Sequence, residues 1–321
     1  MKAAIVRAAG KAPVYGDFAE PEPLPGEQRV HVTAAALSNL VRGRASGSHY
    51  SVAGGFPIGV GIDGVGRLDD GSRVYFLMPR TPFGSMAERT AVPAAQCLPV
   101  PDGLDDVMAA ALANPGMSCW AAFTERARLE AGETVLINGA TGTTGRLGVQ
   151  VARHLGAARV IATGRNPEAL HALKALGADE TISLRDGEAA LDERFGQLFA
   201  EGVDVVLDHL WGPVALRLLT AAARATKSGR RVRFVQSGSM AGTEIMLPSA
   251  LLRAAAIELM GTGLGSVPID RLLHAIGAVY GAAGPASFVI ATDPVPLAEF
   301  EQAWPRKDSS RRTVFTVGTA A

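Results

Sequence analysis

The chain has 321 residues, enough for about two domains with a sizeable buried core. It is 48% hydrophobic and 19% charged, a composition that excludes an intrinsically disordered protein. Lys plus Arg and Asp plus Glu both total 31, so the formal net charge of zero gives no electrostatic footprint for nucleic acid and no pull toward an anionic membrane.

The cysteines and the apolar runs indicate the compartment. Cys97 and Cys119 are too few for a disulfide framework or a Cys-based zinc cluster. The run Ala3–Val6 is too short for a signal peptide, and the longest apolar stretch, Val107–Phe123, is broken by Asn114-Pro115-Gly116 and is not a membrane span. We therefore expect free buried thiols in a soluble, cytoplasmic protein without a membrane partner.

The first hundred residues predict a β-rich region. The six glycines between Gly54 and Gly66 are typical of tight turns and bent strands. From Asp105 to Arg128 an alanine-rich pattern predicts a helix interrupted at Pro115-Gly116. Strands are expected at Lys2–Arg7, Arg29–Ala36, Arg73–Met78 and Met86–Val92.

Strands and helices then alternate, which predicts right-handed βαβ crossovers and a parallel sheet covered on both faces. The strands are expected at Thr134–Asn138, Arg159–Thr163, Thr181–Ser183, Val203–Asp208, Arg231–Gln236 and Ala256–Met260. The helices are expected up to Leu155 and at Pro167–Leu176, Glu188–Ala200 and Pro213–Ala223. A mixed tail follows, with helices at Ile269–Tyr280 and Leu297–Ala303 and strands at Ser287–Ile290 and Thr313–Val317, and we expect it to pack onto the N-terminal part.

The most informative motif is Gly139-x-x-Gly142-x-x-Gly145, which lies between a predicted strand and a predicted helix. Glycines permit the tight turn that aims backbone N–H groups at a pyrophosphate, and a helix N-terminus favours the negative charge. With several βα units after it, the motif favours dinucleotide binding over a merely structural turn. The residues expected to bind are Gly139, Thr141, Gly142, Thr143, Thr144 and Gly145.

The end of the second strand indicates which dinucleotide binds. NAD-binding folds place Asp or Glu about 20 residues beyond the loop, and this chain has Gly164-Arg165-Asn166 there. A guanidinium suits the 2′-phosphate of NADP, so we expect NADP(H), with Gly164, Arg165 and Asn166 in contact. The alternatives are that Arg165 is a solvated charge and that Asn166 only caps the helix beginning at Pro167.

Further candidates follow the later strands of the predicted sheet. Asp208-His209 comes after the fourth strand and Ser237-Gly238 after the fifth. Because such folds bind their ligands at the carboxyl ends of the strands, we expect Asp208, Ser237 and Gly238 to line the cofactor site. Each is also an ordinary turn residue.

Several segments together resemble the medium-chain dehydrogenase/reductase superfamily, in particular its zinc-independent quinone oxidoreductase and enone reductase branch. They include Pro57-Ile58-Gly59-Val60-Gly61-Ile62-Asp63-Gly64-Val65-Gly66, Gly132-Glu133-Thr134-Val135-Leu136-Ile137 and Leu176-Gly177-Ala178-Asp179. The resemblance implies an α/β fold of two domains. Residues 1–113 and 267–321 would form a β-rich, GroES-like catalytic domain, and residues 114–266 a Rossmann domain with a doubly wound parallel sheet of about six strands.

Within the superfamily, zinc alcohol dehydrogenases carry a Gly-His-Glu segment where this chain has Gly61-Ile62-Asp63. A catalytic zinc normally needs three protein ligands, and Cys97, Cys119 and six scattered histidines do not supply them. We therefore expect no metal. What the resemblance implies is delivery of a hydride from NADPH to a small apolar electrophile, a quinone or the C=C bond of an α,β-unsaturated carbonyl compound.

The substrate loop departs from the branch. The N-terminal Asn-Pro-x-Asp element of the branch aligns with Ser38-Asn39-Leu40-Val41 of this chain, where both the expected Asn and the expected Asp are changed. The nearby Ser46–Tyr50 segment matches the branch's Ser-Gly-x-Tyr region with one extra residue, His49. Tyr50 is the candidate donor to the substrate oxygen and His49 its rival, unless both only line a surface loop.

Two other classes of protein were compared with this one. A short-chain dehydrogenase needs Tyr-x-x-x-Lys, and no tyrosine of the chain has a lysine at the fourth following position. A family member that binds NADPH without turnover is compatible with the altered loop and remains the alternative. The resemblance also implies a homodimer through the edge strand Ala256–Met260.

Overall fold

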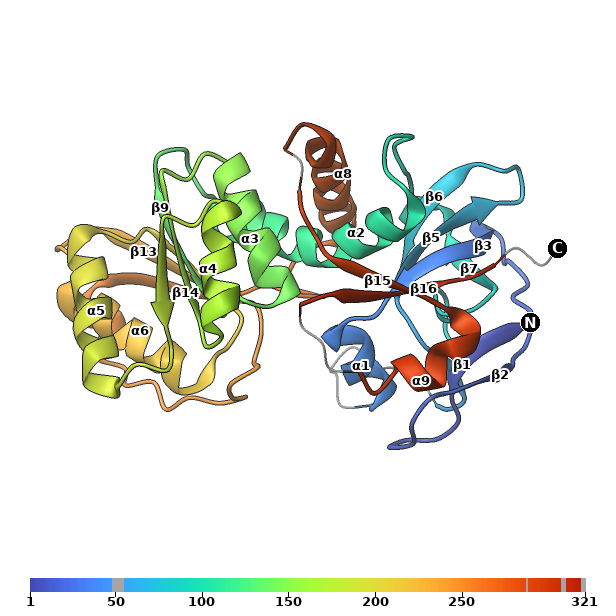
Figure 1. The fold of residues 1–321 in the computed structure, drawn as a ribbon, viewed down its shortest axis with the longest axis horizontal. Coiled ribbons are helices and arrows are strands. Elements are labelled where there is room, and N and C mark those ends of the chain that lie inside the picture. The colour runs from blue at the N-terminus through green and yellow to red at the C-terminus, as the bar shows by residue number, and fades with distance from the viewer. Residues whose placement is uncertain (48–54, 287, 307–309, 319–321) are drawn as a thin grey trace. The chain divides into compact units, whose positions relative to one another are not determined.

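A computed structural model describes residues 1–47, 55–286, 288–306 and 310–318. The chain forms two compact units (Figure 1). Residues 1–114 and 276–321 make the first, here called the β-rich unit, and residues 115–275 make the second, here called the parallel-sheet unit.

The parallel-sheet unit contains a six-stranded sheet of order β11-β10-β9-β12-β13-β14, in which all neighbours are parallel. The chain runs outward from β9 to β11 and then returns to the other side of β9 as β12, so the strand order reverses between β9 and β12. The strands are β9 (Thr134–Asn138), β10 (Arg159–Gly164), β11 (Glu180–Ser183), β12 (Val205–Asp208), β13 (Arg231–Gln236) and β14 (Ala256–Gly261).

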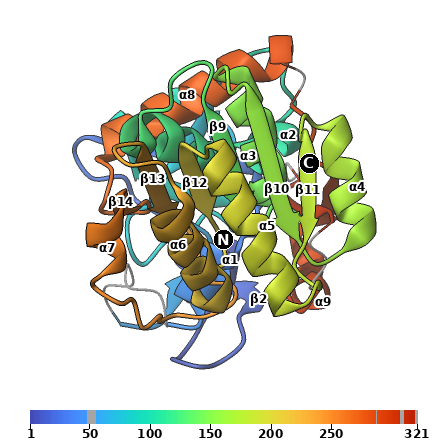
Figure 2. The same cartoon turned by 90° about the vertical axis from the view of Figure 1, so that its left-hand side faces the viewer.

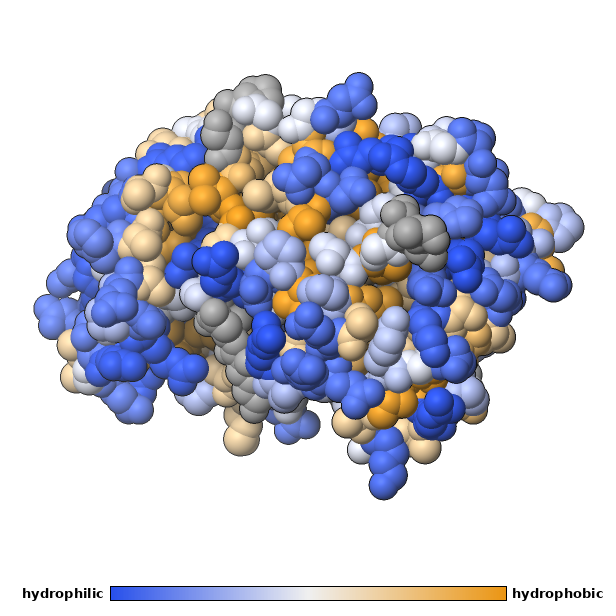
Figure 3. All heavy atoms as spheres, turned by 45° about the vertical axis from the view of Figure 1, so that its right-hand side comes forward, coloured by the Kyte–Doolittle hydropathy of each residue, from blue (hydrophilic) through white to orange (hydrophobic). Residues whose placement is uncertain are grey.

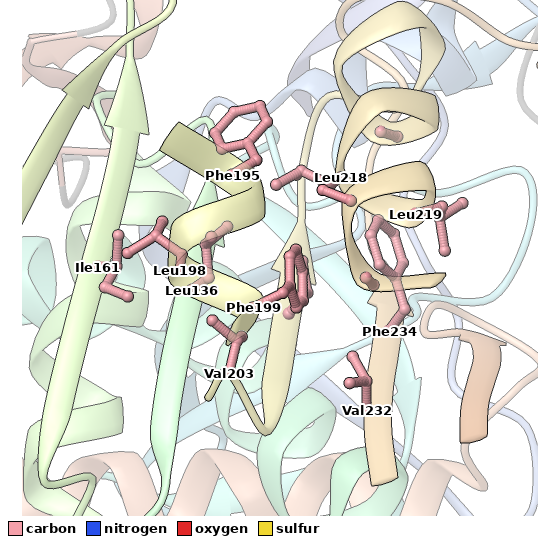
Figure 4. Close-up of a cluster of buried hydrophobic side chains, with 14 of the residues drawn as sticks. Leu136, Ile161, Phe195, Leu198, Phe199, Val203, Leu218, Leu219, Val232 and Phe234 are labelled. Carbon is pink, nitrogen blue, oxygen red and sulfur yellow. The ribbon is translucent and has the colours of Figure 1, made fainter. Parts of the chain in front are cut away.

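Helices connect these strands, and Figure 2 shows α5 and α6 side by side over one face of the sheet. Apolar side chains from that face, among them Leu136 and Phe234, pack with Phe195, Phe199 and Leu219 into a fully buried core (Figure 4). The helices are α3 (Thr143–His154), α4 (Pro167–Ala175), α5 (Glu188–Glu201), α6 (Gly212–Ala225) and α7 (Leu251–Ala254).

The β-rich unit contains a seven-stranded sheet of order β15-β16-β3-β5-β6-β8, with β7 also paired to β3, and a smaller sheet β2-β1-β4. Two glycines of β5 allow close approach to β3, since a Cβ at Gly66 would lie 2.3 Å from the carbonyl oxygen of His31 and one at Gly64 would lie 2.8 Å from that of Ala34. The strands are β1 (Lys2–Val6), β2 (Val14–Asp17), β3 (Glu27–Ala36), β4 (Ile58–Gly59), β5 (Asp63–Leu68), β6 (Arg73–Leu77), β7 (Arg89–Pro93), β8 (Cys97–Pro99), β15 (Thr292–Pro296) and β16 (Arg312–Thr316).

The remaining helical segments complete the chain. They are α1 (Asn39–Ala45), the 3-10 turn Ala94–Gln96, α2 (Asp106–Ala121), the π-helical turn Ala122–Ala127, α8 (Ile269–Ala286), the 3-10 turn Leu297–Glu299 and α9 (Phe300–Ala303). The division between the units falls inside α2 and α8. The α/β fold class predicted from the sequence is confirmed, and the tail does join the N-terminal part, because β16 pairs with β3 through Val314 and Ala36.

The predicted interruption at Pro115-Gly116 is wrong, since α2 continues through both residues. Proline removes one helical hydrogen bond. Here Ala109–Ala113 before it and Ala121 after it are almost completely buried. Burial on both sides of the proline outweighs the local preference.

The predicted strand at Ser287–Ile290 is also misplaced. Ser287 lies outside the described residues, and residues 288–290 are not in a strand. The strand is β15, which contains Pro294 and Pro296 and lies at the sheet edge. An edge strand tolerates prolines because one side of its backbone forms no ladder, and those prolines conceal the strand in the sequence.

The surface mixes hydrophilic and hydrophobic residues on the face drawn in Figure 3. Large hydrophobic side chains that are exposed include Met240, Met246 and Leu259. No helix among the described residues combines the length and the apolar character that crossing a bilayer requires.

Candidate functional site

The motif Gly139–Gly145, here called the glycine turn, lies at the carboxyl end of β9, where the strand order reverses. Gly139 has φ +82°, a left-handed conformation that favours glycine. A Cβ at Gly145 would lie 2.5 Å from the Cα of Ala140, so only glycine lets α3 pack so closely on the turn. A Cβ at Gly142 would meet nothing within 4 Å, so the backbone there faces open space.

These three roles match the demands of a dinucleotide pyrophosphate: a tight first turn, an accessible second backbone segment, and a close helix–strand contact at the third glycine. Gly142 precedes the 12-residue helix α3, and no side chain caps the helix there. The N–H groups of Thr143 and Thr144 in its first turn therefore suit an anion. The residues present fit the pyrophosphate of a dinucleotide.

The end of β10 lies against this turn. A Cβ at Gly164 would lie 2.3 Å from Cγ2 of Thr141, so the two segments are in close contact. The next residue, Arg165, is exposed and makes no hydrogen bond or ion pair with another described residue. The Oδ1 atom of Asn166 accepts a hydrogen bond from the backbone N–H of Ala169 at 3.0 Å, so Asn166 is the N-cap of α4.

Asp208, at the end of β12, is fully buried. Its Oδ1 accepts from the N–H of Leu210 at 3.0 Å and its Oδ2 from that of Trp211 at 3.0 Å. Burial raises the pKa of this carboxyl, while the hydrogen bonds from Leu210, Asn138 and Trp211 oppose the rise. The carboxyl group of Asp208 thus accepts hydrogen bonds from backbone N–H groups of the protein itself.

Ser237 and Gly238 lie beside Asp208, as the strand order requires. Their backbone N–H groups donate to the carbonyl oxygen of Asp208 at 2.7 and 3.2 Å. A Cβ at Gly238 would lie 2.7 Å from the carbonyl oxygen of His209, so glycine is needed for this contact. The hydroxyl of Ser237 lies 3.3 Å from that of Ser118 in α2.

His209 follows Asp208 and is 9% exposed. Burial lowers the pKa of its imidazole to about 4, so the ring is neutral at pH 7. Its Nε2 atom has no hydrogen-bond partner among the described residues. An open pocket of about 340 Å³ lies at the carboxyl ends of β13 and β14, lined by Trp211, Gln236, Thr243, Leu259, Met260 and Gly261.

Three residues at this edge did not stand out in the sequence. Asn138 and Thr163 are fully buried at the ends of β9 and β10. Arg146, in α3, donates from Nε to the carbonyl oxygen of Thr141 at 3.0 Å and so braces the glycine turn. A signal existed for the first two, since each is a polar residue at the end of an apolar strand.

The β-rich unit holds the altered loop. Ser38 is the N-cap of α1, and its Oγ accepts from the N–H of Val41 at 3.1 Å. The catalytic candidates His49 and Tyr50 lie outside the described residues. No group of three His, Cys, Asp or Glu side chains that could hold a metal ion occurs in the described ranges.

Both thiols are free. Cys119 is buried and its Sγ donates to the carbonyl oxygen of Thr144 at 3.2 Å. Burial raises the pKa of the Cys119 thiol and raises that of half-buried Cys97 to about 11, so both stay protonated at neutral pH.

Comparison with known proteins identifies the family. A family model described as "Zinc-binding dehydrogenase" matches residues 143–276. A "Probable NADPH-dependent quinone reductase tdiC" from Emericella nidulans is 30% identical over an alignment that covers 99% of this chain and 100% of that protein. The chain belongs to the medium-chain dehydrogenase/reductase superfamily, in its quinone and enone reductase branch.

Other members of the superfamily agree with this. Prostaglandin reductase-3 of Mus musculus is 29% identical over 74% of this chain and 64% of its own. The quinone oxidoreductase of Thermus thermophilus, whose structure was also solved with NADPH, superposes with a TM-score of 0.82 at 28% identity and covers 98% of this chain and 100% of its own.

Proposed function

We propose that this protein is an NADPH-dependent oxidoreductase that reduces a quinone or the C=C bond of an α,β-unsaturated carbonyl compound without zinc. The observation that carries the proposal is the glycine turn, whose three glycines each meet a separate demand of the pyrophosphate. NADP(H) is the cofactor, and when bound it supplies a hydride.

The residues of the parallel-sheet unit have separate tasks in holding NADP(H). The N–H groups of the turn and of the first turn of α3 bind the pyrophosphate. Arg165, which has no partner of its own among the described residues, binds the 2′-phosphate, because a guanidinium presents two parallel donors to a phosphate. Ser237 and Gly238 extend the site at the carboxyl ends of the strands. Asp208 stabilises this region through hydrogen bonds with backbone groups.

Residues 114–266 are thus assigned to the cofactor, and residues 1–113 with 267–321 to the substrate. Tyr50, with His49 as its rival, donates a hydrogen bond to the substrate oxygen. Zinc independence is supported by Gly61-Ile62-Asp63, which lacks the His-Glu pair of zinc enzymes, and by a thiol at Cys119 that is engaged with Thr144. The substrate is then an electrophile that needs little activation.

The experiment is NADPH oxidation measured with a panel of quinones and enones. Turnover of at least one class supports the proposal. Tight NADPH binding without turnover on any of them contradicts it and supports the alternative, a family member that binds NADPH without catalysis. Tyr50→Phe and a matched change in β2, Tyr15→Phe, test the substrate contact, and only the first is expected to lower kcat.

Replacement of Arg165 tests the 2′-phosphate contact. Arg165→Ala is expected to weaken NADPH binding by about 1–3 kcal/mol and to leave NADH binding nearly unchanged, because NADH lacks the phosphate. Arg224→Ala, an exposed arginine at the end of α6, is the matched control. Equal losses for NADPH and NADH in Arg165→Ala would contradict the assignment.

We also propose a cytoplasmic homodimer that pairs through β14. This strand lies at the sheet edge, and Leu259 in it is 36% exposed. An edge strand has unpaired N–H and C=O groups that a second copy can bond. The molar mass in solution tests this, and a monomeric mass at micromolar concentration would contradict it.

A further inference from the structure

Three buried polar side chains meet where the strand order reverses. Asn138, Thr163 and Asp208 stand at the ends of β9, β10 and β12, and each is 0% exposed. Thr163 Oγ1 lies 2.7 Å from Oδ1 of Asn138, and Nδ2 of Asn138 lies 2.7 Å from Oδ1 of Asp208. The backbone N–H of Gly139 donates to Thr163 Oγ1 at 3.1 Å.

The donors and acceptors present fix the direction of every hydrogen bond in this network. An ionised Asp208 only accepts, and three N–H groups point at it, from Asn138, Leu210 and Trp211. Asn138 must therefore turn its NH₂ group to Asp208 and its oxygen to Thr163. The Thr163 hydroxyl then has to donate to that oxygen, which leaves its lone pair for the N–H of Gly139.

The chain of bonds thus has one arrangement, and it ends on two stretches of backbone. One end holds Gly139, the first residue of the glycine turn. The other end holds Leu210 and Trp211, and Trp211 has φ +57°. The two stretches also touch, because the side chain of Leu210 lies 2.8 Å from where a Cβ of Gly139 would be.

We propose that Asn138, Thr163 and Asp208 are positioning residues for NADP(H), which hold the glycine turn in the orientation that binds the pyrophosphate. The proposal rests on NADP(H) binding at this edge. A turn with three glycines has few side chains to fix its backbone, so without the network it would have to be ordered by the cofactor at a cost in affinity. The positioning acts through Gly139, and none of the three side chains has to touch the cofactor.

Thr163→Val tests this, because valine keeps the shape and removes the hydroxyl. We expect the Kd for NADPH, measured by fluorescence titration, to rise about tenfold. The Kd for adenosine 2′-phosphate should stay within about twofold, because that ligand lacks the pyrophosphate that the turn binds. Thr163→Ser restores the hydroxyl and should restore NADPH affinity, an outcome that a packing role would not give.

Thr90→Val is the matched control, since Thr90 is equally buried but lies in the β-rich unit. It should leave both Kd values unchanged. Asp208→Asn is the second variant and decides the question if Thr163→Val does not fold. It removes the charge that fixes the direction of the hydrogen-bond network, so it should also raise the Kd for NADPH.

The proposal is overturned if a folded Thr163→Val or Asp208→Asn variant binds NADPH as tightly as the wild type, or if Thr163→Val weakens adenosine 2′-phosphate as much as NADPH. Failure of the cofactor assignment itself is distinguishable, because the wild type would then not bind NADPH. Neither measurement depends on turnover of a quinone or an enone.

Discussion

Each unit of the molecule buries an aspartate, and the two differ in what surrounds the carboxyl group. In the parallel-sheet unit, Asp208 receives three N–H donors, two of them from backbone. In the β-rich unit, Asp63 receives the hydroxyl of Tyr75 at 3.1 Å on Oδ2, while its Oδ1 has no partner among the described residues.

The electrostatics of Asp63 follow from this. Burial raises the pKa of Asp63 to about 6, although the charge of buried Arg312 and the hydrogen bond from Tyr75 oppose the rise. The comparison teaches that burial with a single hydrogen-bond donor gives a carboxyl group whose pKa is about 6, whereas three N–H donors connect the carboxyl group of Asp208 to the backbone on both sides of it. Three predictions test this contrast, from the largest expected effect to the smallest.

The first compares two buried threonines. Thr163→Val removes a hydroxyl that both donates and accepts, so it is expected to lower the free energy of unfolding by about 1–3 kcal/mol. Thr90→Val removes a buried hydroxyl without a partner among the described residues, so it should leave the stability unchanged or raise it. Urea unfolding measures both changes. Equal losses of unfolding free energy in the two variants would contradict a stabilising role of the network of Asn138, Thr163 and Asp208.

The second concerns His209, whose folded pKa of about 4 lies below its ordinary 6.5. The unfolded chain binds a proton first as the pH falls, so the contribution of His209 to stability is complete above pH 6.5 and is lost progressively between pH 6.5 and pH 4. His209→Gln removes this loss. The decrease in unfolding free energy from pH 7 to pH 5 should shrink by about 2 kcal/mol in the variant. An unchanged decrease would contradict the burial of a neutral imidazole.

The third concerns Asp63 and has the opposite sign. Its folded pKa of about 6 lies above its ordinary 3.8, so the folded state binds the proton first and its contribution to stability is lost as the pH rises through 6. In the wild type, Asp63 therefore makes the free energy of unfolding about 1 kcal/mol higher at pH 5 than at pH 7. Asp63→Asn should remove that difference, whereas Asp208→Asn, measured in the same way, tests whether the bonded carboxylate lacks it.

Local motifs could be predicted from the sequence because their residues are close together along the chain. The turn at Gly139–Gly145 and the cap at Asn166 depend on what each residue's own backbone and side chain permit. The pattern failed where packing overrides local preference, as at Pro115 inside α2 and at Pro294 in the edge strand β15.

Of the candidate site, the glycine turn, Arg165 and the strand-end residues were found in the sequence, because a parallel sheet brings the carboxyl ends of its strands to one edge. The environment of each residue was not readable. Asp208 was expected to line the cofactor site, and the structure shows both of its oxygens engaged with the protein's own N–H groups. That it contacts the cofactor stays a prediction, as do the roles of Tyr50 and His49.

The sequence by itself determined the fold class, the position of the glycine turn and the positive charge at the end of the second strand of the sheet, because these depend on short segments. Only the tertiary structure decided that Asn138 meets Thr163 and Asp208, which lie 25 and 70 residues further along the chain. The pairing of β9 with both β10 and β12 brings them together, and since buried polar groups must find partners, their meeting orders the turn.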